Sequence, residues 1–177
     1  MSPQAWTFVT LGAAGALAVA GVAFVSERVG GFRKSGEEGG TTWFYDQSEK
    51  RLYKVPRDTI PPDKGIGGPS GDGVRAVVVA FRAEQDDPRK WRIAYLETCT
   101  PELKDLLAKV QAARANGQAS VGGIPARDSD YFQTNSLVKG LDETEWHAIS
   151  SPEGRRAMTA WRSWRGPDGQ PPVVCVP

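Results

Sequence analysis

The chain has 177 residues, with 22 Lys and Arg against 21 Asp and Glu, a formal net charge of +1 and a mean hydropathy of −0.41. A near-neutral chain of mixed charge has no electrostatic field to hold a polyanion, which argues against nucleic acid as a partner. After the N-terminal segment, no uncharged run approaches the length of a membrane-spanning helix, so a polytopic membrane protein is excluded.

The N-terminal segment is the strongest signal in the sequence. Residues 1–26 contain no Asp, Glu, Lys or Arg. The apolar run from Ala5 to Val25 would form a helix roughly 30 Å long, about the thickness of the hydrocarbon core of a bilayer. Trp6 and Phe24 stand near its two ends, where aromatic side chains prefer the membrane interface. We therefore predict a transmembrane anchor over residues 1–28.

A cleaved signal peptide is the alternative interpretation of this segment. Residues 18–20 and 21–23 offer small residues at the spacing of a cleavage site. However, no basic side chain precedes the apolar run, and the run exceeds a typical signal core, so a retained single-pass anchor is favoured. Arg28, Arg33 and Lys34 follow the run, but this bias is small, and the side of the soluble domain stays open.

Small residues dominate the interior of the predicted anchor. Nine of the twelve residues from Gly12 to Ala23 are Gly or Ala. Gly12, Ala16 and Ala20 would lie on one helix face, at a spacing that allows close approach of a second helix. The partner would be another membrane protein or a second copy of this chain. The competing explanation is that these Gly and Ala residues have no role in helix packing.

A glycine-rich linker over residues 29–41 is predicted next, followed by a soluble domain over residues 42–177. Five glycines and mixed charge between residues 30 and 40 cannot bury a core. Residues 42–45 and 51–55 are short aromatic and β-branched runs around a polar turn, which predicts a hairpin. Residues 56–73 are rich in Pro and Gly and predict a long irregular loop.

Two longer strands are expected after this loop. Residues 74–81 form an apolar run that suits the centre of a sheet. Residues 91–97 return after a turn, and strict alternation would place Trp91, Ile93 and Tyr95 on one face.

Two helices are predicted to begin with the same N-terminal sequence motif. Thr100 and Ser151 are each followed by Pro and Glu, which places a hydroxyl at the N-cap and an acid in the first turn. The first helix carries an apolar stripe of Leu103, Leu106, Leu107 and Val110 and ends at Asn116-Gly117. The second, with Ala157, Met158, Trp161 and Trp164 at helical spacing, has about three turns before Gly166-Pro167.

Residues 130–139 and 144–149 are predicted as further strands, and residues 171–177 as an edge strand or an extended tail. The resulting order is ββββα-ββα. Consecutive hairpins favour a mainly antiparallel sheet, with both helices on one face. The predicted fold class is therefore α+β: one transmembrane helix, a flexible linker and a small sheet domain with two helices.

Cys99 and Cys175 are the only cysteines, and they form a disulfide candidate in an exported domain. In the cytoplasm they would remain thiols. Cys99 directly precedes a helix N-cap, where the helix dipole can lower the pKa of a thiol, and His147 is the only histidine available as its base. A small buried apolar residue is the favoured interpretation of Cys99.

The remaining chemical signals are weak. One His and two distant Cys do not make a zinc site, and the acidic groups do not follow the pattern of a calcium loop. The glycines of residues 65–73 lack the Lys and Ser/Thr of a phosphate loop. Four arginines beside Trp161 and Trp164 suggest a surface for anionic lipid or an acidic partner, but a core-facing tryptophan stripe is favoured. We therefore predict no catalytic, cofactor-binding or metal-binding residues.

These observations together predict a membrane-anchored, non-enzymatic binding or scaffold domain, in the role of an accessory subunit of a membrane protein complex. Its expected partners are the lipid bilayer and another membrane protein. Two alternatives stay open: a small thiol-dependent enzyme that uses Cys99, and a secreted protein whose apolar segment is a cleaved signal.

Overall fold

A computed structural model describes residues 40–67, 71–117 and 125–177 of the chain. The chain divides into two units at residues 36 and 37, and the second, residues 37–177, contains all of the described residues. The predicted anchor, with Gly12, Ala16 and Ala20, lies outside the described residues, as does most of the predicted linker. Within the described part, no helix is both long enough and apolar enough to cross a membrane.

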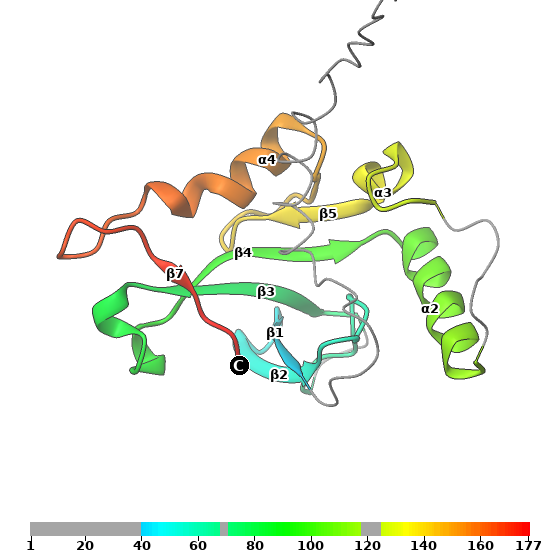
Figure 1. Cartoon of the computed structure of the whole chain (residues 1–177), viewed down its shortest axis with the longest axis horizontal. Coiled ribbons are helices and arrows are strands. Elements are labelled where there is room, and N and C mark those ends of the chain that lie inside the picture. Colours follow the sequence, from blue (N-terminus) through cyan, green and yellow to red (C-terminus); the bar gives the residue numbers. More distant parts are fainter. Residues whose placement is uncertain (1–39, 68–70, 118–124) are drawn as a thin grey trace, which may run out of the picture. The chain divides into compact units, whose positions relative to one another are not determined.

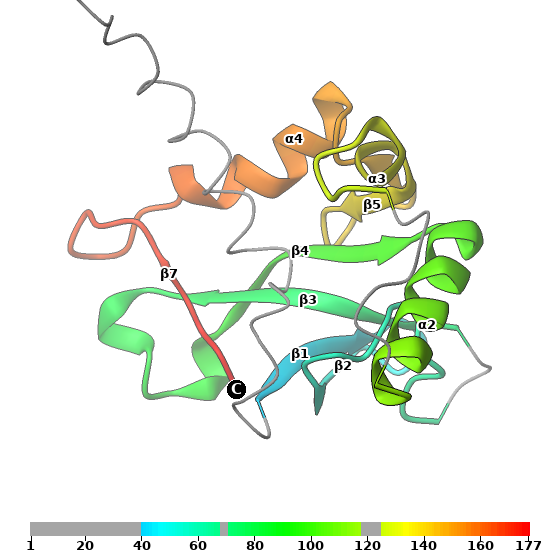
Figure 2. The same cartoon turned by 45° about the vertical axis from the view of Figure 1, so that its right-hand side comes forward.

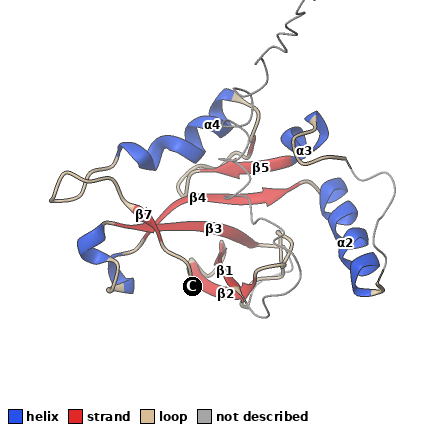
Figure 3. Ribbon diagram, in the orientation of Figure 1, coloured by secondary structure: helices blue, strands red, loops and turns tan. Residues whose placement is uncertain are grey.

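The second unit is built on one antiparallel sheet with the strand order β2-β1-β3-β4-β5-β6 (Figures 1 and 3). The strands are β1 (Thr41–Asp46), β2 (Arg51–Pro56), β3 (Gly73–Ala80), β4 (Arg92–Cys99), β5 (Ser136–Lys139), β6 (His147–Ala148) and β7 (Val173–Val174). β1 pairs with the beginning of β3, and β7 pairs with its end. The predicted mainly antiparallel α+β domain is confirmed.

The first hairpin forms as predicted. β1 and β2 pair over their full length, from Thr41 opposite Pro56 to Asp46 opposite Arg51. Asp46 closes the turn, because its carboxylate accepts hydrogen bonds from the backbone N–H of Glu49 and the hydroxyl of Ser48. The long loop that follows is also present, and it contains one isolated bridge between Asp63 and Gly73.

The predicted alternation along β4 is wrong beyond Ile93. Ile93 pairs with Val78, but Tyr95 pairs with Val77, so Ala94 is an extra residue in a β-bulge. A bulge shifts the following residues to the opposite face of the sheet. Trp91 and Ile93 therefore share one face, while Tyr95 belongs to the core on the other.

The two predicted helix starts are confirmed. Helix α2 (Pro101–Ala115) is capped by the hydroxyl of Thr100, which accepts from the N–H of Leu103. Helix α4 (Pro152–Thr159) is capped in the same way by Ser151, and a 3-10 turn, η3 (Ala160–Ser163), continues it. After α2, Gly117 adopts a φ of +74°, a left-handed conformation that favours glycine and ends the helix.

The region between these helices differs from the prediction. Residues 130–139 are not one strand, because Asp130–Asn135 forms a helix, α3, and only Ser136–Lys139 is extended. Ser129 caps α3 by accepting from the N–H of Phe132. The strand predicted over residues 144–149 is reduced to His147–Ala148, so the described domain has three α-helices instead of two.

One face of the sheet is covered by α4 and η3. Ala157 and Trp161 pack against Val79, Tyr95 and Val138, and Trp161 is 4% exposed. The predicted core-facing tryptophan stripe is therefore confirmed. Figure 2 shows α4 running along the β5 side of the sheet, with α2 at the end of β4.

Candidate functional site

The second face of the sheet carries an unusual concentration of aromatic side chains. It is referred to below as the tryptophan face. Aliphatic side chains of β3 and β4 lie closest to the sheet and form its base. Aromatic and basic side chains pack over them and form its outer, aromatic layer. Its members are Trp43, Tyr45, Leu52, Lys54, Val74, Ala76, Val78, Trp91, Ile93, Leu96, Thr98, Lys139, Trp146 and Cys175.

The base of this face is fully packed, whereas its aromatic layer is only partly covered. Val74, Val78 and Leu96 are each 1% exposed, but Trp43 and Trp91 keep part of their surface in contact with solvent. The rings of Trp43 and Trp91 meet edge to face across β3, with their centroids 5.6 Å apart. This arrangement covers small β3 side chains with rings brought in from β1 and the start of β4.

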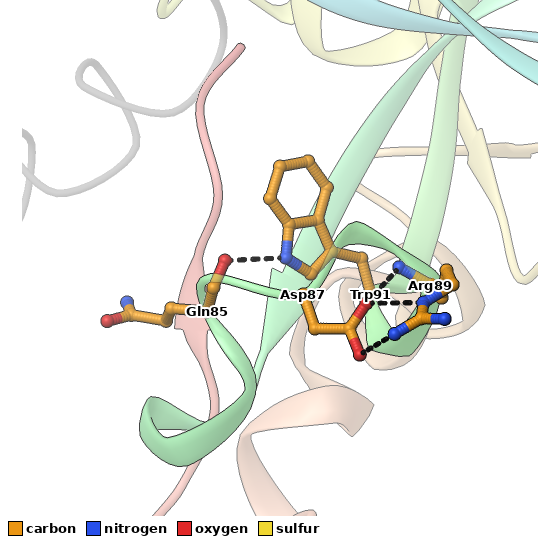
Figure 4. A network of polar contacts seen from close by, with 4 residues as sticks. All are labelled: Gln85, Asp87, Arg89 and Trp91. Carbon is orange, nitrogen blue, oxygen red and sulfur yellow. Dashed lines mark hydrogen bonds and ion pairs between the residues drawn. The ribbon is translucent and has the colours of Figure 1, made fainter.

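The β3–β4 connection fixes the position of Trp91 (Figure 4). Its indole N–H donates to the backbone carbonyl of Gln85 at 2.9 Å. Asp87 caps the next turn by accepting from the backbone N–H of Arg89 and forms an ion pair with the guanidinium of the same residue. The ring of Trp91 is therefore held in place by contacts within the β3–β4 connection itself.

Two lysines lie over tryptophan rings on this face, in different environments. Lys54 Nζ is 5.1 Å from the ring centroid of Trp43, and Lys54 is exposed. Lys139 Nζ is 4.9 Å from the ring centroid of Trp146, and Lys139 is only 9% exposed. Burial lowers the pKa of Lys139, and the carboxylate of Glu143 partly opposes this effect. The two lysine–tryptophan pairs therefore differ in burial: Lys139 is buried, whereas Lys54 is exposed.

Several polar atoms on this face have no partner. The indole nitrogen of Trp43 and the hydroxyl of Thr98 are buried and make no hydrogen bond. Lys139 makes no hydrogen bond or ion pair with any of the described residues; its ammonium lies over the ring of Trp146 and interacts electrostatically with the carboxylate of Glu143. Each of these groups is able to donate a hydrogen bond, so the face is rich in donors without acceptors.

The cysteines do not form a reactive site in the structure. Cys99 Sγ donates to the carbonyl of Pro61, and burial raises the pKa of the thiol to about 11, opposite to the lowering expected beside an N-cap. Cys99 and His147 lie two strands apart, paired with Ser136 and Val138 respectively. Cys99 is therefore a buried residue without a base beside it.

The two cysteines are free thiols in the structure. Cys175 packs with the tryptophan face, whereas the alternation along β4 places Cys99 on the opposite face of the sheet. A disulfide requires Cβ atoms about 4 Å apart, so this arrangement does not support the disulfide candidate.

The glycine-rich loop has a structural role in this arrangement. Asp46 is fully buried, and its second carboxylate oxygen accepts from the N–H of Ile66 at 2.7 Å. The hydroxyl of Tyr53 lies against Gly73, and burial, followed by nearby aspartates, raises its pKa to about 12. Among the described residues, no group of His, Cys, Asp or Glu side chains is placed to hold a metal ion.

The preceding section of the same loop is held by side chains from β3, β4 and α2. Four of its backbone carbonyls accept hydrogen bonds from four different side chains. Arg75 donates to Thr59, Cys99 to Pro61, Lys104 to Pro62 and Gln111 to Asp58. These contacts fasten α2 to the end of the sheet, so that among the described helices α4 and η3 are the ones that cover a face.

In comparisons with known proteins, no protein family, curated protein or solved structure matches this chain. The site must therefore be interpreted from its own geometry. Sequence reasoning missed the tryptophan face, because its members come from separate strands and depend on the bulge at Ala94. The available signals were the run of three aromatics from Trp43 to Tyr45 and the tryptophan that precedes β6.

Proposed function

We propose that the chain is a membrane-anchored, non-enzymatic binding domain, an accessory subunit of a membrane protein complex that contacts its partner through the tryptophan face. The observation that carries this proposal is the partly covered aromatic layer of that face, in which Trp43, Trp91 and Trp146 pack over a buried aliphatic base and keep part of their surface in solvent. Tryptophan is enriched at the centres of protein interfaces, where it buries a large area and offers a donor.

The predicted anchor supports the membrane part of the proposal. Residues 1–26 carry no charged side chain, and the 13 residues of the predicted linker would span about 20 Å as a flexible chain. A domain on such a tether stays close to the bilayer and meets other membrane proteins at high effective concentration. An enzymatic role has no support in the surroundings of Cys99.

The first experiment tests the anchor. Membrane fractionation of the full-length chain should place it in the pellet, and protease protection will define the side of the domain. Intact mass of the mature chain should equal that of the whole sequence. A shortened mass would replace the anchor with a cleaved signal and make the protein a secreted one.

The second experiment tests the binding role. The full-length chain is extracted in mild detergent, and its assembly state is measured by size exclusion with mass determination. A stoichiometric partner should be retained by the wild type and by Lys109→Glu, a matched charge reversal on exposed α2, but lost from Lys54→Glu on the tryptophan face. A wild-type chain that remains monomeric and without a partner would refute the proposal.

A further inference from the structure

The outer side of α4 and η3 carries an excess of positive charge. Residues 152–165 contain four arginines and one acid, Glu153, which gives this segment a net charge of +3. Because the whole chain has a net charge of +1, the rest of it has a net charge of −2. The other long helix, α2, mixes basic and acidic side chains. The arginines of α4, η3 and the residues after them are referred to below as the arginine face: Arg155, Arg156, Arg162 and Arg165.

Helical geometry places these arginines away from the sheet. Ala157 and Trp161 are buried against the sheet, whereas Arg155, Arg156 and Arg162 are exposed. Arg155 and Arg162 are separated by two helical turns and therefore lie on the same side of the helix. Because Trp161 belongs to the core, this surface is formed by the arginines without that ring. The tryptophan face is on the opposite side of the sheet.

Local contacts position the guanidinium groups without neutralising their charge. Arg155 donates to the backbone carbonyl of Ser150, and Arg165 donates to two backbone carbonyls of the residues just before it. The guanidinium of Arg162 is 5.9 Å from the ring centroid of Trp161. A guanidinium has five N–H donors, so Arg155 and Arg165 keep N–H groups that an anion can accept from.

Nearby acids do not compensate these charges. No acid among the described residues forms an ion pair with Arg155, Arg156 or Arg165. Glu153 is in the first turn of α4, where its carboxylate favours the positive end of the helix dipole. Asp168, in the turn after η3, accepts from a backbone N–H at 3.0 Å. The arginine face is therefore a positive surface that suits an anionic partner.

Anionic phospholipid headgroups match this surface in chemistry and in position. Guanidinium groups bind phosphate oxygens through paired hydrogen bonds, and they do so better than ammonium groups. The predicted anchor and its linker would keep the domain within about 20 Å of a bilayer. The apolar side of α4 already packs in the core, so the contact would be with headgroups, without insertion among the acyl chains.

We propose that the arginine face docks on anionic phospholipid headgroups of the bilayer that holds the anchor. This inference rests on the proposed function, because the predicted anchor brings the domain to the membrane. Headgroup contact on the α4 side of the sheet leaves the tryptophan face pointing away from the lipid. That face then stays open to a partner protein.

Arginine footprinting of the full-length chain in lipid nanodiscs tests the contact. Discs of phosphatidylcholine are compared with discs that also contain phosphatidylglycerol, and modification by hydroxyphenylglyoxal is quantified by mass spectrometry. The arginine face should react about threefold or more slowly in the anionic discs at low salt. High salt should remove this protection, because exposed charges are screened. Arg51 and Arg89, which are exposed on other elements, should react equally in both discs.

Substitutions assign the protection to this face. The double variant Arg155→Gln, Arg156→Gln removes two charges, each of which strengthens association with an anionic surface by a factor of about 5. Protection of Arg162 and Arg165 should therefore fall severalfold. The matched control, Lys90→Gln with Lys109→Gln, removes the same charge from exposed positions elsewhere and should keep the protection. Equal reactivity in the two discs, or protection that survives the double arginine variant, would overturn the proposal.

Two further measurements separate lipid from other anions. Millimolar inorganic phosphate, added to phosphatidylcholine discs, should give no protection. Protection by phosphate equal to that by phosphatidylglycerol would assign the face to a free anion and overturn lipid docking. Protection in mild detergent that depends on a co-purified protein, without anionic lipid, would assign the face to an acidic protein and overturn it as well.

The outcomes also separate this inference from the proposed function. A wild type that keeps its partner, while its arginine face reacts equally in both discs, would overturn the lipid contact alone. Protection in anionic discs without any co-purifying partner would support the lipid contact and refute the binding role. A mature chain cleaved after the apolar segment would overturn both, because nothing would then hold the domain at the bilayer.

Discussion

Gly154 offers a sharp test of how α4 packs on the sheet. A Cβ atom at this position would lie 2.1 Å from the carbonyl oxygen of Ala148 and 2.9 Å from its carbonyl carbon. Ordinary van der Waals contact begins near 3.4 Å, so an added methyl group is more than 1 Å too close to backbone atoms. Backbone cannot rotate away as a flexible side chain can. We therefore expect Gly154→Ala to push α4 away from the sheet.

The magnitude follows from two opposing effects. Alanine favours an isolated helix over glycine by about 1 kcal/mol, which would stabilise the variant. Overpacking costs about 1–3 kcal/mol or more, and displacement of α4 also loosens Ala157 and Trp161 in the core. Because the clash is with backbone atoms, the overpacking cost lies near the top of this range, about 3 kcal/mol. Subtracting the gain in helix propensity leaves a net destabilisation of about 2 kcal/mol, or a melting temperature roughly 4–8 °C lower.

The assay is thermal and urea unfolding of the full-length chain, followed by tryptophan fluorescence and circular dichroism. Arg156→Ala is the matched control, because Arg156 is exposed on the same helix and its side chain makes no hydrogen bond or ion pair with the described residues. The stability of this variant should change by less than about 0.5 kcal/mol. Gly154→Ala with a melting temperature equal to or above that of the wild type would refute the close approach.

Three further predictions concern the thiols, alkaline stability and the helix caps. Cys175 should react with a disulfide reagent at pH 8 well before Cys99, whose pKa is raised to about 11 by burial; equal rates under native conditions would contradict this. Because burial also raises the pKa of Tyr53 to about 12, the folded chain holds these protons more tightly than the unfolded chain, so urea midpoints should fall as pH rises from about 9 to 12. Thr100→Ala and Ser151→Ala should each cost about 1 kcal/mol of the free energy of unfolding, measured by urea denaturation, and the matching serine or threonine exchanges should cost much less.

Features set by neighbouring residues were predictable from the sequence. The N-caps at Thr100 and Ser151 depend on a hydroxyl followed by proline, and the first hairpin depends on a polar turn between two short apolar runs. These signals act within one turn of the backbone, so no tertiary contact is needed to produce them.

Features set by contacts between distant residues were not predictable. Residues 130–139 are predicted as one strand, but Ser129 caps a helix there, and Asn135 donates back to the carbonyl of Tyr131. The bulge at Ala94 is a property of the β3–β4 pairing, which a single strand does not reveal. The tryptophan face is hidden for the same reason, because its members share a face only through the pairing of β1, β3, β4 and β5.

The placement of the helices explains why the tryptophan face exists. α2 is fastened to the loop of residues 56–63 at the end of the sheet, so within the described part of the chain α4 with η3 is the one helical layer that covers a face. The opposite face must cover its small β3 side chains with rings from neighbouring strands. Indole rings bring N–H groups that need acceptors, and the nitrogen of Trp43 has none. The described residues leave this aromatic layer only partly covered, which is the composition expected of a surface that a binding partner completes.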